Sequence, residues 1–131
     1  IMATYVGVAE EATERAVKLA RRRADRPEVV AQVGRMHNRL TSARDAVTAM
    51  ITSADDLRFE NTIDHADVTL RRKTNAAEAC IDAVRLALEL GGGIAYGRPS
   101  GIERLFRDVH GALYHPLPAA KQEMFTGEHV L

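Results

Sequence analysis

Hydrophobic residues recur along most of the chain at the three- and four-residue spacing of α-helices. The clearest series lies in the second quarter of the chain: Val33, Met36, Leu40, Ala43, Val47, Met50, Ala54 and Leu57. Its strict alternation of three and four is a heptad pattern, typical of helices that pack at a shallow angle in bundles and coiled coils. The series predicts one long helix over residues 28–58, with Pro27 suited to its first turn.

Two more long helices are expected, one on each side of this series. The first follows Tyr5 and ends at the arginines 21–23, whose charge complements the negative end of the helix dipole. The other extends from His65 to Leu90, and the glycines 91–93 end it because glycine adopts left-handed backbone conformations without steric cost. The apolar positions of each helix fall on one face: Val8, Ala9, Ala12, Ala16, Leu19 and Ala20 in the first, and Ala77, Cys80, Ile81, Val84 and Leu88 in the other.

Two short helices complete the pattern. Ser100 and Glu103 have the spacing of a capping box and predict a helix through about His110. Pro118 is suited to start a last helix over residues 119–129. No segment shows the alternation expected of a strand. We therefore predict an all-α fold, an antiparallel helical bundle of three long and two short helices.

Composition and charge exclude several classes of protein. Eighteen Lys and Arg balance eighteen Asp and Glu, which argues against a domain dedicated to nucleic acid or a membrane surface. No apolar run approaches the roughly 20 residues of a membrane helix. The single cysteine, Cys80, excludes an internal disulfide. With no visible secretory signal, a cytoplasmic protein is expected.

Few residues qualify as candidates for chemistry. No Asp or Glu stands three residues before any histidine, so the di-iron motif of helix bundles is missing and no metal site is expected. Cys80 lies on an apolar face, which favours a small core residue over a nucleophile. The basic residues 21–26 and 71–73 could hold phosphate, but no aromatic residues are interleaved with them, so solvated clusters are expected. From spacing alone, the glycine run is expected to be a helix stop. His115 differs, because it lies in a proline-containing turn, where scaffolds present functional side chains.

The segment from Gly92 to Leu131 resembles the C-terminal helical domain of the acyl-CoA dehydrogenase superfamily. Members carry Gly-Gly-x-Gly-Tyr, then Glu-Arg-x-x-Arg-Asp, and then usually a Tyr-Glu-Gly-Thr turn. Residues 92–96 match the first motif with one glycine replaced by alanine, and residues 103–108 match the second at the same separation. Tyr114 falls at the tyrosine of the turn. Residues 5–9 are similar to the first helix of this domain, so the resemblance covers nearly the whole chain.

The resemblance implies that residues 1–131 are the C-terminal domain of a longer flavoprotein and are inactive alone. It implies that the cofactor is FAD and that the backbone of Gly92 and Gly93 approaches it, with Tyr96 beside them. Glycine is needed there because any Cβ would hold the ligand away. It also places Arg23 at a family arginine. The family arrangement further implies that the bundle forms the core of a tetramer of identical or different subunits, and that the glycine run meets the flavin of a neighbouring subunit.

Two positions depart from the family pattern. Glu89 stands where many relatives have a glutamine facing the flavin pyrophosphate, and a carboxylate there would repel phosphate. His115 replaces the turn glutamate that, in many members, abstracts the α-proton of an acyl thioester. Some relatives keep that base on the first helix, which here would lie upstream of Ile1. A histidine at this turn is similar to the related flavin monooxygenases, and imidazole exchanges protons near neutral pH.

Three functions are therefore considered, of which the first is the one we expect and the others are alternatives. The first is an FAD-dependent acyl-CoA dehydrogenase of fatty acid metabolism, which oxidises a CH–CH bond of an acyl thioester. The second is a monooxygenase that uses reduced flavin, FMN in this case, and oxygen on another small molecule. The third is a non-catalytic subunit of a mixed oligomer. For the enzymes, the segment between the glycines and His115 is expected to enclose the flavin ring.

Overall fold

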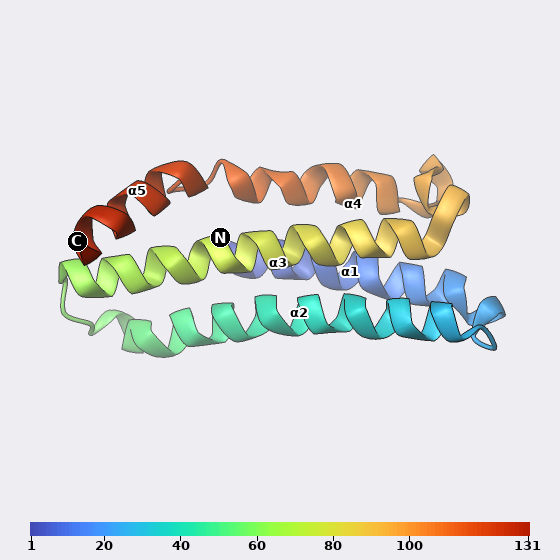
Figure 1. Cartoon of the computed structure of the whole chain (residues 1–131), viewed down its shortest axis with the longest axis horizontal. Coiled ribbons are helices and arrows are strands. Elements are labelled where there is room, and N and C mark those ends of the chain that lie inside the picture. Colours follow the sequence, from blue (N-terminus) through green and yellow to red (C-terminus); the bar gives the residue numbers. More distant parts are fainter.

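The computed structural model describes residues 1–131 and contains helices but no strands. The five α-helices are α1 (Met2–Ala20), α2 (Pro27–Ala54), α3 (Ile63–Tyr96), α4 (Ile102–Val109) and α5 (Ala119–Val130). The long helices α1, α2 and α3 lie side by side along the molecule, while α4 and α5 follow one another along another side of α3 (Figure 1). The predicted all-α bundle of three long and two short helices is confirmed.

Small side chains bring α1 close to the rest of the bundle. Four alanines on one face of α1 are at most 3% exposed: Ala9, Ala12, Ala16 and Ala20. They join a single core with residues of the other helices, among them Met36, Leu40, Val84, Leu90, Ile102 and Val109. Because alanine adds only a methyl group to the helix surface, α1 packs nearly backbone to backbone against its neighbours.

The heptad series of α2 is confirmed except at its end. Met36, Leu40 and Ala43 are buried, but Leu57 is 82% exposed and does not belong to the core. The helix ends at Ala54 rather than near residue 58, because Asp55 adopts a left-handed conformation with φ of 41°. Two more residues with positive φ, Asp56 and Leu57, follow it. Non-glycine residues rarely adopt this conformation, and apolar spacing gives no sign of it.

The third helix begins before and extends beyond its predicted bounds. It starts at Ile63, where the Thr62 hydroxyl accepts a hydrogen bond from the His65 amide over 3.2 Å. At Gly92 the backbone takes φ of 59° and ψ of −146°, which breaks the helix before it resumes to Tyr96. The glycines therefore interrupt α3 as predicted, but one further turn follows them.

The predicted capping box at the start of α4 is wrong. Gly101, with φ of 69°, takes the N-cap position, and no side chain caps the helix. The Ser100 hydroxyl instead donates to the Ala95 carbonyl over 2.8 Å and accepts from the Ile102 amide over 3.2 Å. Ser100 thus stabilises the loop between α3 and α4, a role that depends on tertiary geometry rather than on spacing.

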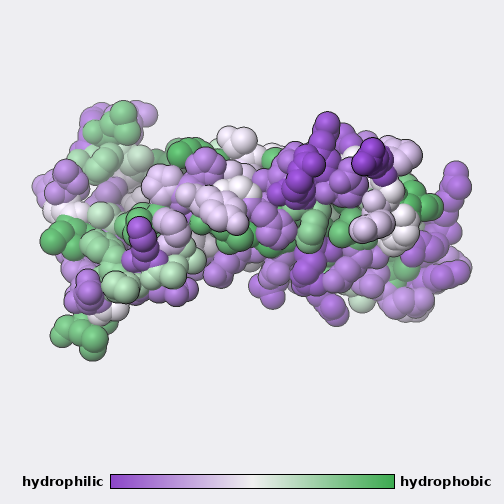
Figure 2. Space-filling model, turned by 90° about the horizontal axis from the view of Figure 1, so that it is seen from above, coloured by the Kyte–Doolittle hydropathy of each residue, from purple (hydrophilic) through white to green (hydrophobic).

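The face of the molecule over α4 and α5 carries hydrophobic side chains mainly at one end. Figure 2 shows them gathered at the end that carries the C-terminus, whereas hydrophilic side chains cover much of the surface over α4. Large apolar residues are exposed between α2 and α3, at the start of α3 and at the C-terminus, namely Leu57, Ile63, Val130 and Leu131. None of the five helices has an apolar stretch long enough to cross a membrane.

Candidate functional site

The predicted site residues lie in two regions of the bundle. We call the first region the glycine end; it comprises Gly91, Gly92, Gly93 and Tyr96 with the nearby Arg23. The second is the His115 turn, residues 114–118, which connects the 3₁₀ turn after α4 to α5. Figure 1 shows the break in α3 at one end of the bundle and α4 leading back from it towards this turn.

The three glycines of the run differ in the space around them and in backbone conformation. Gly91 is buried, and a Cβ there would overlap the Ala95 Cβ and lie 3.3 Å from Leu19 Cδ1. Gly92 has the positive φ that breaks the helix, in a region open essentially to glycine alone. Gly92 and Gly93 are exposed, and nothing lies within 4 Å of the position of a Cβ at either. A flat or phosphate-bearing ligand can therefore approach the backbone at both.

The other predicted residues of the glycine end are held differently. Tyr96 is 77% exposed beside the glycines and free to contact a ligand. The Arg23 guanidinium donates to the Leu90 carbonyl over 2.6 Å, which ties the end of α1 to the break in α3. Glu89 pairs with Arg85 over 2.5 Å. Arg85 therefore offsets part of the negative charge that Glu89 would present to a phosphate.

The His115 turn presents its imidazole against the first turns of α1. The ring centroids of His115 and Tyr5 are 5.5 Å apart, with 51° between the ring planes. Tyr5 also lies against the backbone of the 3₁₀ turn, since a Cβ at Gly111 would stand 2.7 Å from Tyr5 Oη. The neighbouring His110 is bound to the Phe106 carbonyl over 2.6 Å, whereas His115 makes no such bond within the chain. Of the two, His115 is the one available to a substrate.

The structure does not bring these two regions together. His115 contacts Tyr5 near the start of α1, whereas the glycine end contacts Arg23 beyond its other end. Arg23 follows Tyr5 by eighteen positions, which corresponds to about 27 Å at 1.5 Å per residue of helix. The expectation that the segment from the glycines to His115 encloses one flavin ring is therefore wrong, because α4 packs along α1 and α3 instead.

The prediction that Lys73 belongs to a solvated basic cluster is wrong, because this cation is buried behind the His115 turn. Its side chain is 7% exposed, and Nζ donates to the carbonyls of Ala112 and Leu117 over 3.1 and 3.0 Å. Burial lowers the pKa of this ammonium group. The sequence contains the information that Lys73 is buried. Lys73 precedes Ala77 and Cys80 by four and seven residues, so it lies on the same buried face of the helix. A lysine at such a position rarely lacks a specific partner.

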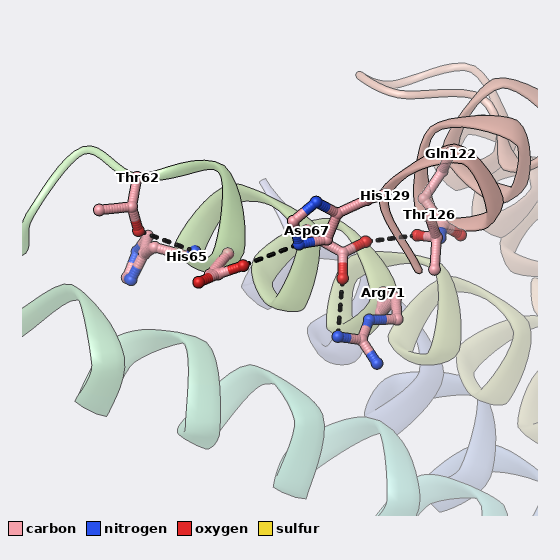
Figure 3. Close-up of polar contacts among 8 residues, drawn as sticks. Thr62, His65, Asp67, Arg71, Gln122, Thr126 and His129 are labelled. Atoms are coloured by element: carbon pink, nitrogen blue, oxygen red, sulfur yellow. Dashed lines mark hydrogen bonds and ion pairs between the residues drawn. The ribbon is translucent and has the colours of Figure 1, made fainter. Parts of the chain in front are cut away.

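A cluster missed by sequence analysis joins α5 to α3 (Figure 3). Asp67 is 1% exposed, and its carboxylate pairs with Arg71 over 2.7 Å and accepts from the Thr126 hydroxyl over 2.5 Å. Gln122 donates to the same Thr126 oxygen over 2.7 Å. The hydrogen bond from Thr126 holds the pKa of Asp67 below its usual value, and Arg71 acts in the same direction against the effect of burial. The cluster fastens the last helix.

We expect Asp67→Asn to destabilise the protein at neutral pH and to matter less in acid. A carboxylate whose pKa is lowered by folding stabilises the fold above its unfolded pKa of about 3.9, and this contribution is lost as the pH falls through the folded value. Urea unfolding at pH 7, 5 and 3 measures the difference between variant and parent. Asp64→Asn is the matched control, because Asp64 is 85% exposed and pairs only with His129. An equal effect of both variants at pH 7 would contradict the prediction.

Two further candidates can be placed. Cys80 is fully buried in the core, and burial raises the pKa of its thiol to about 12, so it does not act as a nucleophile. No group of three or more His, Cys, Asp or Glu lies close enough together to hold a metal ion.

Comparisons with known proteins place this bundle. Residues 1–117 match the sequence profile of the family described as acyl-CoA dehydrogenase, C-terminal domain. A similar fold occurs in KijD3 in complex with FMN and dTDP-3-amino-2,3,6-trideoxy-4-keto-3-methyl-D-glucose, at 24% identity and a TM-score of 0.87 over 98% of this chain and 34% of that one. It also occurs in nitrososynthase from Micromonospora carbonacea var. africana, at 24% identity and a TM-score of 0.89 over 99% of this chain and 36% of that one. The chain thus spans about a third of each structure. No curated protein matches it significantly.

Proposed function

Because the chain belongs to the family of acyl-CoA dehydrogenase C-terminal domains, we propose that it is the C-terminal bundle of a longer flavin-dependent oxidoreductase. Its coverage of about a third of the similar structures supports this placement, since the remaining two thirds would supply the other walls of the active site. Residues 1–131 alone would then be inactive. The cofactor would be FAD or FMN.

The reaction that the site supports best is oxygen-dependent oxidation of a small molecule by reduced flavin. The observation that carries this choice is His115, an imidazole held against Tyr5 in a turn where a dehydrogenase of this family usually has a carboxylate. An imidazole can both accept and donate a proton near neutral pH, which suits a substrate amine or hydroxyl group. One similar structure holds FMN with an amino-sugar nucleotide, and another is a nitrososynthase.

The glycine end would hold part of a flavin. A flavin supplies two-electron redox chemistry when bound. On this chain, the backbone of Gly92 and Gly93 offers open space for close approach, Tyr96 offers an exposed ring, and Arg23 stands at the edge, oriented by the Leu90 carbonyl. The distance of about 27 Å between Tyr5, which contacts His115, and Arg23, at the glycine end, favours an oligomer in which the glycine end meets the flavin of a neighbouring subunit while His115 serves its own.

One set of assays on the full-length protein tests the proposal. We expect substrate-dependent oxygen consumption with externally reduced FMN, using dTDP-linked amino sugars as probes, and no anaerobic bleaching of bound flavin by acyl-CoA thioesters. The product should gain oxygen from ¹⁸O₂ in mass spectrometry. Bleaching by an acyl-CoA would establish the acyl-CoA dehydrogenase instead, the candidate that the family match favours. A protein that binds no flavin and turns over nothing would be a non-catalytic subunit.

A further inference from the structure

Lys73 makes an unusual pair of contacts around the His115 turn. Its ammonium group donates to the Ala112 carbonyl, three residues before His115, and to the Leu117 carbonyl, two residues after it. The two acceptors lie 39 and 44 residues from Lys73 along the chain, so these bonds join the middle of α3 to both sides of one turn. No carboxylate lies within ion-pairing distance of this lysine, and the carbonyls are its partners.

The turn itself has few means of holding its shape. Pro116 and Pro118 have no backbone N–H to donate. Tyr114 donates to the Gly111 carbonyl over 3.1 Å, and the next hydrogen bonds of this kind begin with α5. The surroundings of Lys73 on α3 are apolar, including Ala77, so burying a charge there costs free energy unless specific bonds offset the cost.

We propose that Lys73 is a positioning residue, which fixes the His115 imidazole by holding the backbone carbonyls on both sides of it with one buried ammonium group. The inference concerns the geometry of the turn, and its consequence for catalysis rests on the proposed function. Bonds from a charged donor are about twice as strong as neutral ones, so two of them can replace the donors that the prolines lack. The imidazole then keeps its place against Tyr5.

Lys73→Met tests the geometry in the full-length protein, by hydrogen exchange and mass spectrometry. We expect the hydrogen-bonded amides of the 3₁₀ turn and its cap, residues 110–114, to exchange about tenfold faster, the effect of losing one hydrogen bond from a charged donor. Arg72→Met is the matched control, because Arg72 donates to the Ala49 carbonyl and Ser53 hydroxyl of α2 and not to the turn. Faster exchange confined to residues 110–114 in the Lys73 variant supports the proposal. Unchanged exchange there, or the same change in both variants, overturns it.

Activity provides the second measurement. We expect Lys73→Met to lower kcat about tenfold with little change in KM, because the substrate still binds while the imidazole is misplaced. Arg72→Met should keep kcat within about twofold. If the turn loosens but neither Lys73→Met nor His115→Ala affects activity, the positioning stands and the proposed function fails. Should Lys73→Met not fold, Lys73→Gln replaces it, since its shorter, neutral amide cannot hold both carbonyls.

Chemical rescue separates positioning from a general structural role. Lys73 lines a groove of about 360 Å³ between α1, α2 and α3, which gives small molecules a route to its position. Propylammonium restores the atoms that Lys73→Ala removes, and we expect it to recover several-fold in kcat and to slow exchange of the turn, whereas propanol does not. Arg72→Ala is the control for this experiment. Equal rescue by propylammonium and propanol, or rescue of Arg72→Ala by propylammonium, would contradict a specific role of the Lys73 ammonium group.

Discussion

His115→Ala lowers kcat of the full-length protein by about 100-fold or more, because a positioned general acid–base contributes roughly 10²–10⁴-fold to a rate. The expectation follows from the turn, where His115 is presented against Tyr5 with no hydrogen bond of its own within the chain. Steady-state kinetics with the probes named above measure the effect. KM should change little, since the imidazole would act on protons rather than hold the substrate.

The neighbouring histidine is the control for this result. His110→Ala removes an imidazole four residues before Tyr114, but one that is bound to the Phe106 carbonyl and packs against the Phe106 ring. We expect the kcat of His110→Ala to stay within about threefold of the parent, since the His110 side chain does not reach into the His115 turn. If His115→Ala kept full activity, or if both variants lost it equally, the imidazole would have no specific role in the reaction.

Gly91→Ala lowers the free energy of unfolding by about 2–3 kcal/mol, the upper range for forcing a methyl group into a packed core. The added Cβ would overlap the Ala95 Cβ, which has no rotamer to move away, and would press on Leu19. Urea unfolding, followed by circular dichroism at about 222 nm under the same conditions for all variants, measures the decrease in the free energy of unfolding.

The other two glycines of the run provide a graded comparison. Gly92→Ala should cost about 1–3 kcal/mol through its positive φ alone, since nothing obstructs its Cβ. Gly93→Ala should stay within about 0.5 kcal/mol of the parent, because it has neither obstacle nor positive φ. Equal effects at all three positions would contradict this division of roles.

Periodicity predicted the fold because it reports which side of a helix is buried. The seam from Val33 to Ala54 and the apolar face of α1 needed no other information. It failed at Leu57, where three consecutive left-handed residues end α2, and at Ser100, whose hydroxyl bonds to carbonyls before it. Both failures concern backbone conformations that a pattern of side chains does not encode.

The site was less predictable, because its contacts join residues far apart in the chain. His115 was identified from its turn and its place in a family motif, and its role stays a prediction. Asp67 was missed and Lys73 was wrongly predicted to be solvated, because the partners that hold these two charged side chains in buried positions lie 39 to 59 residues away. Spacing likewise gave the three glycines one shared role, whereas the structure gives each its own.

The alanine face of α1 has a mechanical consequence. A contact made of methyl groups has no side-chain rotamers to rearrange, so it cannot yield by repacking as a leucine-lined contact does. Between Ala9 and Ala20 the position of α1 is therefore set mainly by its backbone, while larger apolar side chains, Met2 and Val6, are buried nearer its start. Tyr5 and Arg23 lie at opposite ends of this helix, one beside His115 and the other beside the glycines. The helix therefore acts as a rigid spacer that fixes the distance between the imidazole and the glycine backbone. Any subunit that contacts both regions has to fit this distance.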